Sequence, residues 1–400
     1  MLLRVRWSFA LAGIGILFAA ACAGNGMTSL PIGGSATFRA QPHTAGLGPV
    51  LSSALGGSVF GWDMDQTGND GVLTEAVTAR VGTTFGVETF DEPSATITKV
   101  VSKSSSPNGN DEPYLQAVVG NDVGFIDIER DGANFHRNDA FELMNPVTGE
   151  KINEKTNPPQ IADVVTSYVT NNQSSPTQAL MGTRFGIHGK VTFSLFVYNS
   201  QTNAWLTPYT FGPREKFFGN VLYAAVDAHS NKVFVGYQAG QGSINYLPPR
   251  FDVFDGATGK VLRGFKGLGQ GAVNGMAIDS TTGIMCTTTF GDMNVEFYND
   301  STGKGFAVKI PGSGGPLTQG AAVAADQVNH LFLVTQQNST VGPGSTVYVY
   351  DEKGKLIESI SGFSFLDQFS VVPVRIAVNG AQRLGYVPGP NPNNLQSFTY

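Results

Sequence analysis

The amino-acid sequence predicts an all-β fold built from repeated four-stranded antiparallel units, and three observations predict it. The chain of 400 residues contains 50 glycines and 21 prolines but only 14% charged residues, a composition typical of many short strands joined by tight turns. One strand–turn–strand pattern recurs about every 50 residues along most of the chain. Apolar and polar side chains alternate on both sides of these turns, which is the periodicity of strands.

The recurring pattern is a hairpin in which alternating apolar residues lead to an aromatic residue, then to Asp or Asn, and then to a turn that often contains Thr-Gly. Residues 251–260, 295–304 and 347–355 are its clearest copies. Weaker copies hold the same register and bring the count to seven. One large apolar residue anchors each copy; these anchors are Phe90, Met144, Tyr198, Phe254, Tyr298, Tyr350 and Phe398.

A second hairpin precedes four of these copies. In it an apolar run ends at an acidic or amide residue, which is Asp65, Asp227, Asp279 or Asn379. In the run at 322–325 we expect Ala325 to stand at this position. Two hairpins per repeat make four strands, which is one blade of a β-propeller. We therefore expect a seven-bladed β-propeller over residues 51–400, with six or eight blades as the alternatives because residues 102–190 are irregular.

The end of the chain predicts how the ring of blades closes. The last repeat stops at Tyr400, just after its third strand. A blade without its fourth strand would expose a row of unpaired backbone groups. We expect a segment from the N-terminal region to supply this strand, and residues 35–39 are one segment that could do so.

The first 22 residues have the features of an export signal. Residues 7–18 are apolar and uncharged, they follow two arginines, and three alanines come after them. Cys22 follows directly, so this segment resembles a bacterial lipobox, in which the cysteine is diacylated and becomes the mature N-terminus. Ala19 stands where a lipobox usually has leucine, and an ordinary signal peptide with a chance cysteine is the alternative.

Residues 23–50 are small and polar, and we expect them to form a flexible tether. Two or three acyl chains anchor a protein stably where one does not. The sequence therefore predicts an exported lipoprotein of the bacterial cell envelope, periplasmic or surface-exposed.

Two sets of short motifs resemble known propeller families. Residues 168–172 and the hairpin at 192–203 resemble the YVTN-type repeat of bacterial surface proteins. The Thr-Gly-Lys turns at 258–260 and 302–304 are similar to those of NHL-like and quinoprotein-type propellers. The resemblance spans roughly residues 57–400 and implies the fold, whereas one fold hosts many unrelated activities.

The sequence lacks one feature of the quinoprotein-type propellers. Quinoprotein-type blades usually carry a tryptophan three residues after the lysine of the turn, and Arg263 and Ala307 stand there. Quinone binding is therefore not carried over, and we predict no resident cofactor. The net charge of −6, from 25 basic and 31 acidic residues, lacks the positive surface of a nucleic-acid-binding protein.

Two acidic segments are weak candidates for calcium binding. Residues 63–68, with Asp63 and Asp65, resemble the start of an oxygen-rich calcium loop, but the expected twelfth-position Glu is Thr74. The second segment, 127–132, offers Asp127 and Asp131, where Arg130 competes for the carboxylates and Asp-Gly is explained by a turn. His229 and His330 lie in turns between strands, and we interpret them as exposed turn histidines.

The remaining features favour a binding or scaffolding module. Polar loops at 102–113 and 171–177 are typical of a recognition surface for a protein or glycan. The alternative is a lyase or lactone hydrolase with a metal-dependent site in the central channel. Its candidate residues at the channel ends are Asp65, Asp227, Asp279 and Asn379. Because this position recurs in most repeats, we favour the interpretation that these side chains cap turns.

Overall fold

The structure is a computed structural model, and the part of the chain that it describes contains strands and turns. It describes residues 44–64, 70–78, 83–104, 110–119, 122–131, 134–135, 140–145, 148, 150–156, 168–171, 177–185, 191–199, 204–205, 209–211, 223–238, 248–271, 273–289, 292–311, 319–337, 345–364 and 376–400.

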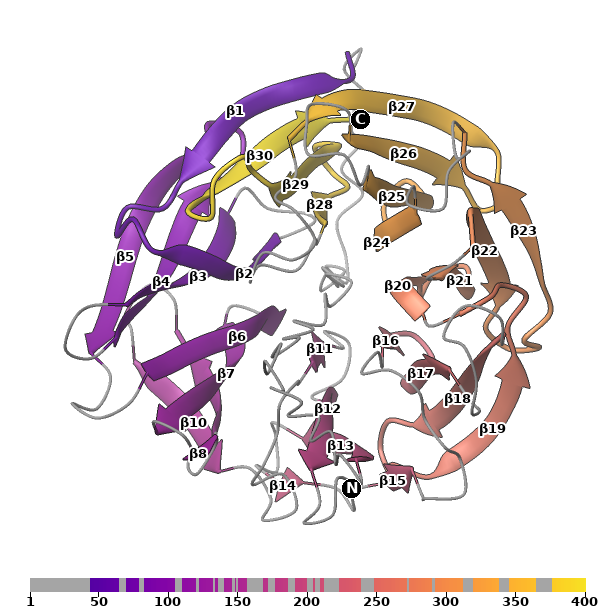
Figure 1. Ribbon diagram of the computed structural model, residues 1–400, viewed down its shortest axis with the longest axis horizontal. Coiled ribbons are helices and arrows are strands. Elements are labelled where there is room, and N and C mark those ends of the chain that lie inside the picture. Colours follow the sequence, from indigo (N-terminus) through magenta and orange to yellow (C-terminus); the bar gives the residue numbers. More distant parts are fainter. Residues whose placement is uncertain are drawn as a thin grey trace, which may run out of the picture.

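The described strands form seven antiparallel sheets, arranged radially as the blades of a β-propeller (Figure 1). We number the blades from the first complete one along the chain. Blade 1 contains β2 (Ser58–Met64), β3 (Asp70–Thr78), β4 (Thr83–Asp91) and β5 (Thr96–Ser104). Blade 2 contains β6 (Asn110–Val119), β7 (Asp122–Asp131), β8 (Asn134–Phe135), β9 (Ala140–Met144) and β10 (Lys151–Thr156). Blade 3 contains β11 (Tyr168–Asn171), β12 (Thr177–Phe185), β13 (Val191–Asn199), β14 (Ala204–Trp205) and β15 (Tyr209–Phe211).

The other four blades have four strands each. Blade 4 contains β16 (Tyr223–Asp227), β17 (Lys232–Gln238), β18 (Pro249–Asp255) and β19 (Val261–Lys266). Blade 5 contains β20 (Val273–Asp279), β21 (Ile284–Thr289), β22 (Asn294–Asn299) and β23 (Gly305–Lys309). Blade 6 contains β24 (Gln319–Asp326), β25 (Leu331–Gln337), β26 (Ser345–Asp351) and β27 (Leu356–Phe363). Blade 7 contains β28 (Ala377–Asn379), β29 (Leu384–Pro388), β30 (Asn394–Thr399) and β1 (Gly46–Ser52).

A strand from the N-terminal region supplies the fourth strand of blade 7, and this confirms the predicted way of closing the ring. β1 pairs with β30 and lies on the outer rim (Figure 1). Gln396 Nε2 donates to the carbonyl of Gly48 at 2.7 Å, and a Cβ on Gly48 would meet Ser397 Oγ at 2.5 Å, so a larger residue at 48 would require the Ser397 side chain to move. The strand lies later than the segment 35–39, which falls outside the described residues. β1 begins at Gly46, within the range 23–50 that the sequence assigned to a tether. The glycines and the proline of this strand conceal its alternation, in which Leu51 is buried and Val50 is exposed.

The core lies between neighbouring blades. One cluster joins Phe297 of blade 5 to Phe332 and Tyr350 of blade 6. Another joins blade 1 to blade 7, where Trp62 is fully buried and its indole N–H donates to the carbonyl of Tyr386 at 3.2 Å. The repeat anchors with described side chains, which are Phe90, Phe254, Tyr298, Tyr350 and Phe398, are all buried. No helix in the described part of the chain is long and apolar enough to cross a membrane.

Candidate functional site between two blades

The turn after the innermost strand has the same construction in blades 4 to 7. It starts at a buried polar residue, which is Asp227, Asp279, Asp326 or Asn379. The side-chain oxygen of this residue accepts a hydrogen bond from a backbone N–H two or three residues later, for example from Thr281 to Asp279 at 2.9 Å and from Gln382 to Asn379 at 3.0 Å. These side chains therefore cap turns.

In blade 6 the turn acid lies one residue later than the sequence predicted. Asp326 pairs with Leu331 as Asp279 pairs with Ile284, so the turn acid of blade 6 is present and Ala325 precedes it. Residues 324–326 match residues 277–279 without a gap, so the expected position was one residue too early.

The fourth residue after the turn acid adopts a left-handed backbone conformation. In blades 4 to 7 this residue is Asn231, Gly283, His330 or Arg383, with φ between 50° and 68°. Such a conformation is uncommon for residues other than glycine. It fixes the tip of each turn, and it places a different side chain at the same point of each blade.

A second position meets the turn residue across four blade boundaries in the described part of the chain, from the boundary of blades 4 and 5 round to that of blades 7 and 1. It is the residue that directly follows the third strand of the next blade. Tyr400 Oη donates to Asp326 Oδ2 at 3.0 Å between blades 6 and 7, and Asn379 Nδ2 donates to Glu92 Oε2 at 2.6 Å between blades 7 and 1. We call each such meeting point a blade junction.

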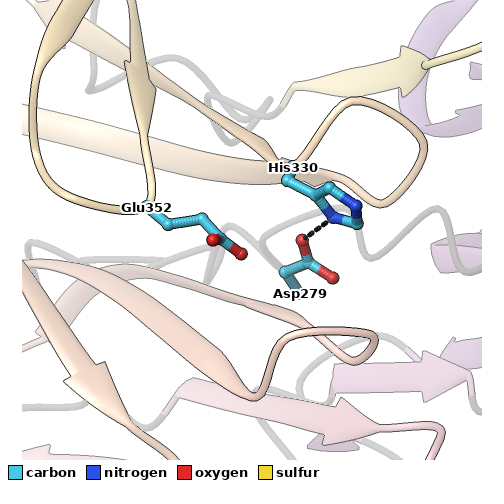
Figure 2. Close-up of side chains that lie close together, drawn as sticks. All are labelled: Asp279, His330 and Glu352. Carbon is cyan, nitrogen blue, oxygen red and sulfur yellow. Dashed lines mark hydrogen bonds and ion pairs between the residues drawn. The ribbon is translucent and has the colours of Figure 1, made fainter.

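The junction between blades 5 and 6 brings Asp279, His330 and Glu352 together (Figure 2). His330 Nδ1 lies 2.8 Å from Asp279 Oδ2 and 3.1 Å from Thr281 Oγ1. One potential ligand atom from each of the three residues lies within 4.8 Å of the others. The side chain of Asp279 is 0% exposed and that of His330 is 46% exposed, so the group joins a buried acid to a solvent-facing imidazole.

Glu352 leaves one oxygen of this group unsatisfied. Its Oε1 is buried and has no hydrogen-bond partner among the described residues. A buried carboxylate oxygen without a donor is costly, because the lost hydration is not replaced. The junction therefore has capacity to bind a cation or a hydrogen-bond donor.

At the two neighbouring junctions a basic side chain lies near the acids. Between blades 4 and 5, burial and the carboxylate of Asp227 raise the pKa of Asp300, while the charge of Lys232 acts in the opposite direction. Between blades 6 and 7, the guanidinium of Arg383 lies 5.6 Å from the centre of the Tyr400 ring, whose hydroxyl binds Asp326. At the junction of blades 5 and 6, Ile284 stands in the register of Lys232.

A different pair of buried acids lies on the third strands. Glu88 Oε1 accepts hydrogen bonds from the backbone N–H groups of Ala54 at 3.0 Å and Leu55 at 3.1 Å, and so it orders the connection between β1 and β2. Burial, followed by the neighbouring Glu75, raises the pKa of Glu88 to about 8. Burial also raises the pKa of Glu296, at the matching position of blade 5, to about 7. Neither acid was predicted as a site residue from the sequence.

The structure describes the backbone of part of each candidate calcium segment. Asp127 and Asp131 lie in β7, where Asp127 pairs with Ala140 and Asp131 with Asn134, so the expected acidic loop is a strand. β7 ends at Asp131, where the sequence predicts an Asp-Gly turn. Asp63 is buried at the end of β2, and Asp65 and Cys22 lie outside the described residues.

Cys286 is a buried thiol in β21. Burial raises its pKa well above the ordinary value, with a further contribution from Glu296. A thiol in this state is a poor nucleophile and a poor metal ligand.

Comparison with known proteins shows the fold. No family model and no curated protein matches the sequence. The structure is similar to a chain of the mitotic checkpoint complex, with 11% identity and a TM-score of 0.58 over 94% of this chain and 98% of that one. It is also similar to the β-propeller domain of Cps50 (Swd1) from Myceliophteria thermophila, with 10% identity and a TM-score of 0.54 over 89% of this chain and 100% of that one. The chain thus has a β-propeller fold of four-stranded antiparallel blades.

Proposed function

We propose that this protein is a lipid-anchored binding or scaffolding propeller of the bacterial cell envelope, which holds a protein partner on a face of the ring. The observation that carries this proposal is how the recurring polar residues of the repeat are used. Asp227, Asp279 and Asn379, the channel-end candidates with described positions, are engaged in turns and blade junctions. A channel enzyme needs such groups directed at a substrate.

The position of the N-terminal strand supports the anchor. β1 lies on the rim, and its first contacts include the hydrogen bond from Thr399 Oγ1 to the carbonyl of Thr44 at 2.7 Å (Figure 1). A chain that enters at the rim leaves both faces of the ring accessible. Propeller faces commonly recognise partners through connections from several blades.

One of the similar structures is a chain of a multiprotein complex, which is consistent with a propeller that acts by assembly. Fold similarity at 11% identity carries no activity from one protein to the other. The proposal for this chain therefore depends on its own residues.

The test is affinity purification of the tagged full-length protein from crosslinked, detergent-solubilised native cells. A Cys22→Ser form, which cannot be diacylated, is purified in parallel. We expect a stoichiometric protein partner with the wild type, and radiolabelled palmitate incorporated into the wild type but not into the variant. A glycan in place of a protein, or no partner with either form, would contradict the scaffold proposal; labelling of the variant would contradict the anchor.

A further inference from the structure

We propose that the junction between blades 5 and 6 binds a divalent metal ion of the zinc class through Asp279, His330 and Glu352. This site lies between blades and is independent of the proposed partner binding. The three residues come from three separate turns, at the end of β20, between β24 and β25, and between β26 and β27 (Figure 2).

The geometry is close to that of a bound ion. Oxygen and nitrogen ligands of tetrahedral zinc lie about 2.0–2.1 Å from the metal, and hence about 3.4 Å from one another. The three potential ligand atoms of the junction already lie within 4.8 Å of one another. A bound ion would widen the 2.8 Å separation between His330 Nδ1 and Asp279 Oδ2 by about half an ångström, and would reduce a separation at the 4.8 Å limit by about 1.4 Å. Rotation of the side chains of His330 and Glu352, the two more exposed residues, can supply both movements.

The side chain of Asp279 and the backbone of His330 are held in place before any metal binds. Asp279 is fully buried, and its Oδ1 accepts hydrogen bonds from Thr281 N at 2.9 Å and Thr281 Oγ1 at 2.6 Å. Its other oxygen, Oδ2, faces the imidazole of His330. His330 occupies the left-handed position of its turn, with φ of 57°, so its backbone direction is fixed.

The third ligand supplies an independent indication. Glu352 Oε1 is buried without a hydrogen-bond partner among the described residues, although it lies beside a second carboxylate. Two carboxylates and a neutral imidazole carry a charge of about −2, which a divalent cation neutralises. The corresponding lysine of the preceding junction is replaced by Ile284.

The ligand types indicate the class of metal. An imidazole favours zinc and its neighbours among the transition metals, whereas calcium and magnesium prefer sites built wholly from oxygen. Three protein ligands leave a fourth position open, and the 46% exposure of the His330 side chain places that position towards solvent. Water would complete the coordination.

The test is calorimetric titration of the full-length protein, purified without a polyhistidine tag, with zinc chloride and separately with calcium chloride. We expect one zinc per chain, and zinc affinity at least about tenfold above calcium affinity. His330→Asn and Glu352→Gln should each weaken zinc binding at least about tenfold, since loss of even an outer partner of a ligand has an effect of this size.

His229→Asn is the matched control, because His229 is an exposed histidine in the corresponding turn of blade 4. It should bind zinc like the wild type. Thermal melting without metal checks folding, and Glu352→Gln should melt at or above the wild-type temperature because it removes an unsatisfied carboxylate. Absence of saturable zinc binding, equal loss in the His229 and His330 variants, or calcium binding as tight as zinc would overturn the proposal.

Discussion

The junctions on either side of blade 6 share one geometry but differ in how their acids are satisfied. At the junction with blade 7, Asp326 accepts hydrogen bonds from the backbone N–H groups of Val328 at 2.9 Å and Asn329 at 3.0 Å. Asn329 Nδ2 and the hydroxyl of Tyr400 also donate to it, at 2.8 Å and 3.0 Å. At the junction with blade 5, Asp279 faces His330, and Glu352 keeps an unsatisfied oxygen.

This difference distinguishes an acid that only stabilises the fold from an acid that can bind a cation. Burial raises the pKa of Tyr400 well above its ordinary value, with Asp326 adding to the shift, so the phenol stays protonated and remains a donor. A carboxylate with a full set of donors has no capacity left for a ligand. The same position in blade 6 carries Glu352, which cannot donate when ionised, and the junction is therefore left open to a cation.

The largest expected effect comes from breaking the satisfied junction. Asp326→Ala removes the acceptor for four hydrogen bonds, and three of the donors belong to the turn itself or to its side chains. We expect a loss of about 3–5 kcal/mol of unfolding free energy, measured by urea denaturation. Asp279→Ala is the comparison, with an expected loss of about 1–3 kcal/mol, because part of its bonding is to a solvent-exposed histidine. Equal losses would contradict the difference between the junctions.

A second prediction extends the comparison to Glu88, a buried acid beside another acid. Its pKa is raised from 4.5 to about 8, so the folded state holds a proton that the unfolded state releases between these pH values. The contribution of Glu88 to the free energy of unfolding should therefore be greatest below pH 4.5 and should fall as the pH rises from 4.5 to about 8. Glu88→Gln should flatten the dependence and raise stability at pH 8 by on the order of 2 kcal/mol.

Urea denaturation at several pH values between 4.5 and 8.5 measures this effect. Glu150→Gln, at an exposed position, is the control and should leave the pH profile unchanged. A Glu88→Gln profile as steep as that of the wild type would show that Glu88 is ionised throughout this range in the folded protein.

A third prediction isolates the donor at the satisfied junction. Tyr400→Phe keeps the buried ring and removes only the hydroxyl that binds Asp326. We expect a loss of about 1–2 kcal/mol, because one acceptor position of a buried carboxylate loses its partner. In a double-mutant cycle with Asp326→Ala the two losses should not add; additive losses would mean that the two groups do not interact.

The smallest effect is expected at the open junction. In metal-free buffer, His330→Asn should cost less than about 1 kcal/mol, since the side chain is 46% exposed and exposed pairs contribute little. Thermal melting with and without zinc distinguishes this role from that of a ligand: zinc should raise the wild-type melting temperature and leave that of the variant unchanged. A variant that melts far below the wild type without zinc would indicate a structural role instead.

The repeated strands, the buried anchors and the turn caps at Asp227, Asp279 and Asn379 could be predicted from the sequence, because each depends on residues close together along the chain. The acid of blade 6 was placed one residue too early, because the four consecutive apolar residues 322–325 can be matched to the other repeats in two ways. The closing strand was predicted in kind but placed too early, because glycine and proline in β1 conceal its alternation.

The site itself could not be predicted from spacing. Asp279, His330 and Glu352 meet only through the packing of blade 5 against blade 6, and their separations along the chain match no metal-binding motif. One signal was present: the residue that follows the third strand is acidic in three copies, as Glu92, Asp300 and Glu352. The recurrence of an acid at this position shows only that it belongs to the repeat. Whether the acid is satisfied or can bind a cation depends on the residue that faces it across the junction.

X-ray absorption at the zinc edge, on full-length protein loaded with one equivalent of zinc, tests the central claim most directly. That claim is that the acids between blades 5 and 6 are left for a cation while those between blades 6 and 7 are already satisfied. The account predicts a zinc ion with a single imidazole ligand and otherwise only oxygen ligands, lost in His330→Asn and retained in Asp326→Asn. Sulfur ligation, two or more imidazoles, or an unchanged spectrum in His330→Asn would place the ion elsewhere and contradict the account.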